Sequence, residues 1–202
     1  MHNHAVAERH ELSTTLRSTG PGASTLCGDW TAALLTAHLI QRERSLSEAL
    51  GRLPVRRFRA RAEARLRDLV AGHEYGELVD TFEAGPPRLS PWSVPALREA
   101  VNLMEYAIHH EDVRRAAPGF LARDKPVAWQ RALWQRLRIS APLTMRAVPV
   151  GVELACPAYG AILTRRAKRG APIVTVTGQS VGIGAGRLRP PAGSSSRVRR
   201  LG

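Results

Sequence analysis

The chain has 202 residues, 44% apolar and 23% charged, a balance typical of a globular domain rather than a disordered chain. Its two cysteines, Cys27 and Cys156, exclude a disulfide framework and fit a reducing cytoplasm, so each is expected to be a small buried apolar residue. With no signal peptide and no run of about 18 apolar residues, a soluble cytoplasmic protein is expected.

The net charge of +13 is concentrated near the end of the chain. No Asp or Glu follows Glu153, whereas nine Arg and Lys residues do, so residues 1–153 carry only +4 of the total. The basic tail has no aromatic side chains that could stack on bases, so a nucleic-acid partner is not expected.

Apolar spacing and Gly-Pro stops predict helices over residues 5–18, 30–40, 56–70, 77–82, 98–116 and 127–143. Asp29 is the expected N-cap of the second helix, and Ile139 an expected buried position of the last. Strands are predicted at 150–154 and 173–177.

These elements predict a mainly α fold, with an antiparallel four-helix bundle over residues 1–147 and a small strand-containing C-terminal piece over 148–178. Residues 179–202 are rich in Gly, Pro, Ser and Arg and are predicted to form a disordered basic tail.

The candidate functional residues lie on the predicted helix 98–116. Glu105 and His109 are four apart, so their side chains project from successive turns and can share a divalent cation. His38, on the same helix face as Trp30 and Leu34, is the best third ligand. Two His and one Glu would leave coordination positions open, as in catalytic metal sites.

Simpler interpretations stay open. Arg98, Asn102, Glu105, His109 and Asp112 advance by three or four residues and so form one polar stripe, which would simply be a solvated face. His38 would then be a hydrogen-bonded core histidine. His110 points away from the His109 face and is expected at the surface or beside the site rather than as a ligand.

Three segments resemble a known family: Leu26-Cys-Gly-Asp-Trp-Thr-Ala-Ala-Leu-Leu-Thr-Ala-His-Leu, Gly85-Pro-Pro-Arg-Leu-Ser-Pro, and the run from Glu99 that contains Glu-Tyr-Ala-Ile-His-His-Glu-Asp-Val-Arg-Arg. They are similar to an actinobacterial metal-binding family related to the N-terminal domain of mycothiol-dependent maleylpyruvate isomerase, within the DinB/YfiT-like superfamily. The resemblance covers roughly residues 5–178. After Gly178 the chain departs from the family pattern, which a shifted reading frame over 179–202 would explain.

The resemblance implies a four-helix bundle that binds a divalent metal through His38, Glu105 and His109. Asp112 and Asn102 are then expected beside the ligands or in the thiol pocket. Zinc is the preferred ion, with nickel, iron or manganese as alternatives, and mycothiol is the implied cosubstrate.

The function predicted on this basis is that of a mycothiol-dependent transferase or isomerase, which activates a low-molecular-weight thiol for reaction with a small electrophile. The alternative is a non-catalytic metal-binding or stress-response protein, so whether the chain is an enzyme is left open. No membrane partner is expected, and a homodimer is left open.

Overall fold

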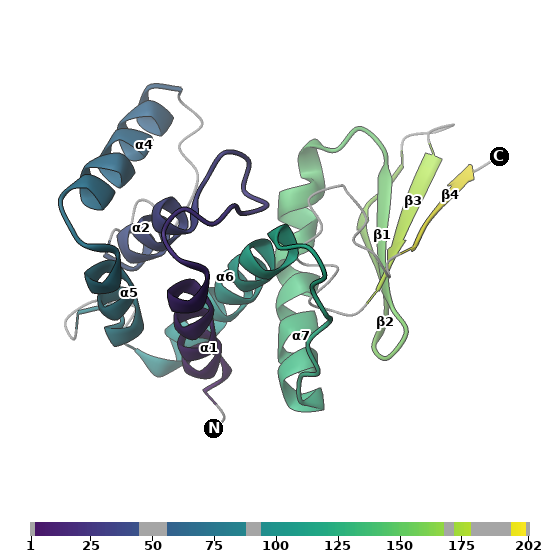
Figure 1. The fold of residues 1–202 in the computed structure, drawn as a ribbon. Helices are drawn as coiled ribbons and strands as arrows, with labels where there is room; N and C mark the ends of the chain where they lie inside the picture. The colour runs from purple at the N-terminus through teal and green to yellow at the C-terminus, as the bar shows by residue number, and fades with distance from the viewer. Residues whose placement is uncertain (1–2, 45–55, 88–93, 168–171, 179–194, 201–202) are drawn as a thin grey trace. The chain divides into compact units, whose positions relative to one another are not determined.

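The structure is a computed structural model that describes residues 3–44, 56–87, 94–167, 172–178 and 195–200. The chain divides into two compact units, Met1–Leu121 and Ala122–Gly202. Across the described ranges the protein is mainly helical, with one small β-sheet (Figure 1). The mainly α fold class predicted from sequence is therefore confirmed, while the four-helix bundle stays a prediction.

The first unit is entirely helical in its described part. Its helices are α1 (His4–Thr19), α2 (Ala32–Arg44), α4 (Arg56–Ala71), α5 (Tyr75–Ala84) and α6 (Pro95–Ala116). Helix α1 packs against α5 and α6, and α2 packs against α4 and α5. The core between them is built from fully buried apolar side chains, among them Leu12, Leu35, Phe82, Leu103 and Tyr106.

Local signals set the ends of these helices. The Asn3 side chain accepts a hydrogen bond from the Val6 amide at the start of α1, and Gly20 ends that helix with φ +81°, a conformation that favours glycine. Helix α2 begins at Ala32, where the Thr31 hydroxyl accepts from the Leu34 amide. The N-cap predicted at Asp29 is therefore wrong.

The second unit places one helix beside a sheet. It contains α7 (Val127–Thr144), the short 3₁₀ helix η2 (Met145–Ala147), β1 (Gly151–Cys156), β2 (Gly160–Arg165), β3 (Pro172–Thr177) and β4 (Ser195–Arg200). The strand order is β2-β1-β3-β4, with β1 and β3 parallel and the outer pairs antiparallel. Helix α7 packs against β2.

Several predictions within this unit are wrong. Helix α7 buries Trp129, Leu133 and Leu137 as predicted, but Ile139 is 69% exposed because only one side of the helix is covered. Strand β2 was not predicted, and only one of its six residues is buried. Strand β4 lies inside the tail that was predicted to be disordered, while residues 179–194 lie outside the described part.

The division of the chain falls before α7, whereas the sequence analysis assigned that helix to the bundle over residues 1–147. Among the described residues, no helix is both long and apolar enough to cross a membrane.

Candidate metal centre

The polar stripe of α6 is not a solvated face. Asn102 and Asp112 are each 1% exposed, His109 is 5% exposed, and Glu105 is only partly exposed. Buried polar groups need partners, because an unsatisfied one costs about 1–3 kcal/mol. The interpretation of this stripe as an ordinary helix surface is therefore wrong, and the partners of these side chains define the site.

Three donor atoms converge at the centre of the stripe. Glu105 Oε1 lies 3.4 Å from His38 Nε2 on α2 and 3.2 Å from His109 Nε2, one turn further along α6. The two imidazole rings meet edge to face, with centroids 5.3 Å apart. The structure thus brings together the three residues predicted as metal ligands, although metal binding itself stays a prediction.

The spacing of these atoms fits a tetrahedral cation. An ion with bonds of about 2.0–2.1 Å to its nitrogen and oxygen ligands separates those ligands by about 3.3–3.4 Å. The separations of Glu105 Oε1 from the Nε2 atoms of His38 and His109, 3.4 and 3.2 Å, agree with that value. All three ligand atoms lie within 4.8 Å of one another, so a small shift of side chains would complete the site.

His109 is fixed from its other nitrogen. Its Nδ1 lies 3.1 Å from Asp112 Oδ2, and the Cys27 thiol donates to the same oxygen at 3.0 Å. In metal sites, a carboxylate on the far nitrogen of a histidine ligand sets its tautomer and orientation. Asp112 therefore lies where a carboxylate that orients a ligand is needed.

Comparison of the chain with protein-family models, curated proteins and solved structures finds no match. The assignment of the site therefore depends on its geometry and its electrostatics.

The ionisation of Glu105 and that of His109 depend on each other. Burial alone would raise the pKa of Glu105, but hydrogen bonds from His109 and His38 and the charge of Arg42 hold it well below its usual value. Burial alone would lower the pKa of His109, but its contacts with Asp112, Cys27 and Glu105 raise it well above its usual value. Both shifts favour a protonated His109 beside an ionised Glu105 in the metal-free protein, so the proton supplies positive charge where a metal ion would otherwise supply it.

Arg42 is the second positive charge at this site. Its Nε lies 3.3 Å from Glu105 Oε1, and its Nη1 donates to the Asn102 amide oxygen at 2.8 Å. Asn102, predicted to lie beside the ligands or in the thiol pocket, therefore acts on Glu105 through Arg42. This arrangement keeps Glu105 anionic and turned toward the two histidines.

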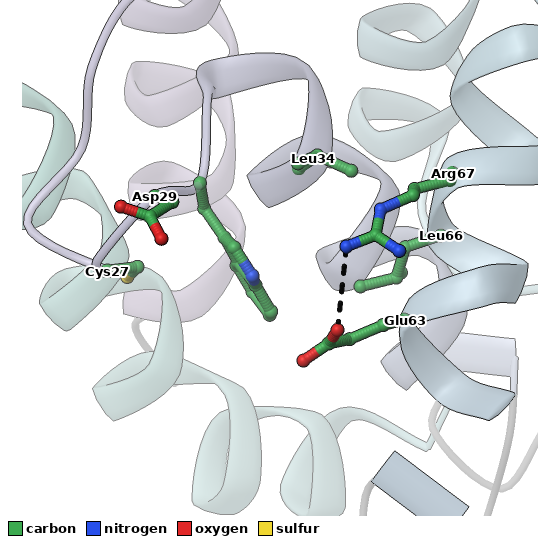
Figure 2. Close-up of a pocket in the computed structure, with 7 residues that line it drawn as sticks. Cys27, Asp29, Leu34, Glu63, Leu66 and Arg67 are labelled. Atoms are coloured by element: carbon green, nitrogen blue, oxygen red, sulfur yellow. Dashed lines mark ion pairs between the residues drawn. The ribbon is translucent and has the colours of Figure 1, made fainter. Parts of the chain in front are cut away.

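A pocket of about 190 Å³ adjoins the site (Figure 2). Cys27 and Asp29 lie on one side of it, and Glu63, Leu66 and Arg67 of α4 on the other. Trp30 also lines the pocket, and its ring lies 5.1 Å from that of His38. A small molecule in the pocket would therefore contact residues that touch His38 and His109 directly.

Two further polar residues differ from their predictions. Cys27 is only partly buried, and its thiol contacts His109 and Asp112, so it is not a simple apolar core residue. His110 is buried, with Nδ1 2.8 Å from Glu8 Oε1 and Nε2 2.8 Å from the Thr15 hydroxyl, so its expected place at the surface or beside the site is wrong. Both errors arise from contacts between residues more than 80 positions apart, which local spacing does not reveal.

Proposed function

We propose that this protein binds one divalent cation, with zinc preferred, through His38, Glu105 and His109. The observation that carries the proposal is the convergence of three ligand atoms from two helices at separations suited to a tetrahedral ion. Three protein ligands leave one position open, which is the arrangement of catalytic rather than structural zinc sites.

The charges around the site favour an anionic substrate atom at the open position. A divalent ion with one carboxylate and two neutral imidazoles carries a net charge of +1. Arg42, 3.3 Å from the Glu105 oxygen, adds one positive charge, and the Asp112 carboxylate on the far side of His109 removes one, so an excess of +1 remains. A fourth ligand with negative charge would reduce this excess, which is costly in a partly buried site. A thiolate meets that requirement, whereas a neutral ligand does not.

On this basis, we propose that the protein is a metal-dependent thiol transferase or isomerase. The bound cation would favour the thiolate form of a small thiol near neutral pH. Residues of the chain would do the rest: Asp112 orients His109, Asn102 and Arg42 orient Glu105, and Trp30 closes the wall beside His38. The adjoining pocket is where the thiol carrier and its electrophile would lie.

The proposal extends to the family suggested by the sequence motifs. The protein would belong with relatives of the N-terminal domain of mycothiol-dependent maleylpyruvate isomerase in the DinB/YfiT-like superfamily. It would use mycothiol as cosubstrate, and its helices would form the corresponding four-helix bundle. The long helix with the Glu105 and His109 pair, packed beside a helix-borne His38, is the feature in favour of this assignment.

Metal content is the first test. Elemental mass spectrometry on untagged protein should find about one ion fewer per chain in His38→Ala and in Glu105→Gln than in wild type. His73→Ala, an exposed histidine in a turn, is the matched control and should keep the ion. An ion content equal to that of wild type in both site variants would contradict the ligand set.

Thiol activation is tested separately with N-acetylcysteine as the probe. Ultraviolet absorbance should show that thiolate forms at lower pH with the metal-loaded wild type than with Glu105→Gln, after subtraction of protein-only spectra. A tightly bound ion without this effect would contradict the thiol chemistry and would support the alternative, a metal-binding or stress-response protein without turnover.

A further inference from the structure

A second group of atoms that could hold a metal ion lies on the opposite side of the His109 ring. His109 Nδ1, Asp112 Oδ2 and Cys27 Sγ form a triangle, with the sulfur 3.6 Å from the nitrogen and 3.0 Å from the oxygen, and the nitrogen 3.1 Å from that oxygen. The three atoms come from two separate parts of the first unit, the loop before α2 and the end of α6. A backbone hydrogen bond from Leu26 to the Asp112 carbonyl holds these two parts together.

We propose that Cys27, His109 and Asp112 form a second cation site, selective for soft divalent ions such as Cd²⁺ or Zn²⁺. Bonds of about 2.3 Å to sulfur and 2.0–2.1 Å to nitrogen place these ligands about 3.5–3.6 Å apart in a tetrahedral site. The distance of 3.6 Å between Cys27 Sγ and His109 Nδ1 already matches that value. Asp112 would have to withdraw by a few tenths of an ångström.

Asp112 supplies an independent reason to expect a ligand. Its side chain is 1% exposed, and its Oδ1 has no hydrogen-bond partner within the described residues. A buried carboxylate oxygen without a partner is costly, since charged groups inside proteins are normally paired or bound to a metal. A cation bound by both carboxylate oxygens of Asp112 would supply the partner that Oδ1 lacks.

The charges also balance at this second site. Cys27 as thiolate and Asp112 as carboxylate carry two negative charges, and His109 binds as the neutral imidazole. A divalent ion would make the group neutral, which suits the buried position of Asp112 and His109. On binding, the thiol proton and the Nδ1 proton are released to solvent. The pocket lined by Cys27 gives the ion a path from solvent.

The two sites differ in the atoms they use and in the ions they favour. The first uses Nε2 of His109 with His38 and Glu105, whereas the second uses Nδ1 with a thiolate. Thiolate ligands select soft ions, whereas imidazole and carboxylate ligands suit borderline and hard ones. The second site needs neither the first site nor the thiol chemistry proposed above. Either proposal can therefore fail while the other holds.

The test is titration with Cd²⁺ alone, followed by the ultraviolet thiolate-to-cadmium charge-transfer band. The full chain has only two cysteines, so Cys156→Ala, which removes a thiol buried in β1, is the matched control for Cys27→Ala. Wild type, Cys156→Ala and the double variant His38→Ala/Glu105→Gln should all show the band. Cys27→Ala should lose it, and circular dichroism checks that each variant is folded.

Three results would overturn the proposal. Absence of the band in wild type would mean that no thiolate binds the ion. Persistence of the band in Cys27→Ala would assign it to the other cysteine. Its loss in His38→Ala/Glu105→Gln would mean that Cys27 only completes the first site. None of these outcomes depends on whether wild type binds about one ion through His38 and Glu105, which the metal analysis above decides.

Discussion

The buried ion pair between Arg9 and Glu43 joins α1 to α2 in the core of the first unit. Arg9 Nη2 lies 3.0 Å from Glu43 Oε1, and the two side chains are 5% and 3% exposed. The Tyr106 hydroxyl donates to the same carboxylate and accepts from Arg9. The guanidinium also lies 5.9 Å from the Phe82 ring centroid, so all of its surroundings are protein.

Glu43→Gln keeps the shape of the side chain and removes its charge, so the Arg9 charge is left buried without compensation. Breaking a buried pair in this way costs about 3–5 kcal/mol. With a urea dependence of about 2 kcal/mol per M, the unfolding midpoint should fall by about 1.5–2.5 M. Burial raises the pKa of Glu43, although Arg9 and Tyr106 lower it, so we expect the full effect at pH 8, where the carboxylate is favoured.

Asp80→Asn is the control, measured by circular dichroism in the same urea series. Arg17 and Asp80 are closer, at 2.6 Å, but their side chains are 41% and 72% exposed. An exposed pair contributes only about 0–1 kcal/mol, so the midpoint should move by less than about 0.5 M. Equal losses in the two variants, or a loss below about 1 kcal/mol for Glu43→Gln, would refute the reasoning that burial rather than distance sets the cost.

Three further predictions concern the site and its support. Asp112→Asn should weaken zinc binding through the first site about 10–100-fold, because the carboxylate no longer orients His109; isothermal titration measures this, and unchanged affinity would contradict it. In the metal-free protein, the raised pKa of His109 gives stability that is complete below the ordinary histidine pKa of 6.5. This stability is lost as pH rises through the pKa that His109 has in the folded protein. The lowered pKa of Glu105 gives stability that is complete above its ordinary pKa of 4.5 and is lost as pH falls through the pKa in the folded protein. The urea midpoint of unfolding should therefore fall both at high pH and at low pH, and this dependence on pH should be weaker in His109→Gln. Gly85→Ala should destabilise by more than about 1 kcal/mol, because φ is +84° and a Cβ would meet a buried guanidinium, whereas Gly76→Ala, with open space around it, should be neutral or stabilising in thermal unfolding.

Much of the helical framework could be predicted from the sequence because its signals are local. Apolar spacing placed all six described helices, and Gly20 and Gly85 lie at two of their ends. The pairing of Glu105 with His109 also follows from helical geometry alone. Its meeting with His38, 67 residues away in the chain, rested on the place of His38 on an apolar helix face and on the motif resemblance, because periodicity gives no information on which helix faces which.

The errors share one physical cause, which is that local patterns do not state how many sides of an element are covered. Ile139 was assigned to a core face that is not covered, whereas His110 was assigned to a surface that is occupied by Glu8. Cys27 resembled an apolar residue because its polar partners lie 82 and 85 positions later. Such contacts depend on tertiary packing and leave no signature in a short window of sequence.

Helix α6 has functional consequences for how this protein can evolve. Between positions 102 and 113 most side chains are buried, and His109 and His110 are adjacent in the chain but engage separate partners, Asp112 and Glu8. A one-residue insertion here would rotate every later side chain by about 100° and exchange the two environments. Insertions and deletions should therefore accumulate elsewhere in the chain. A search for distant relatives should begin with the sequence of this stretch.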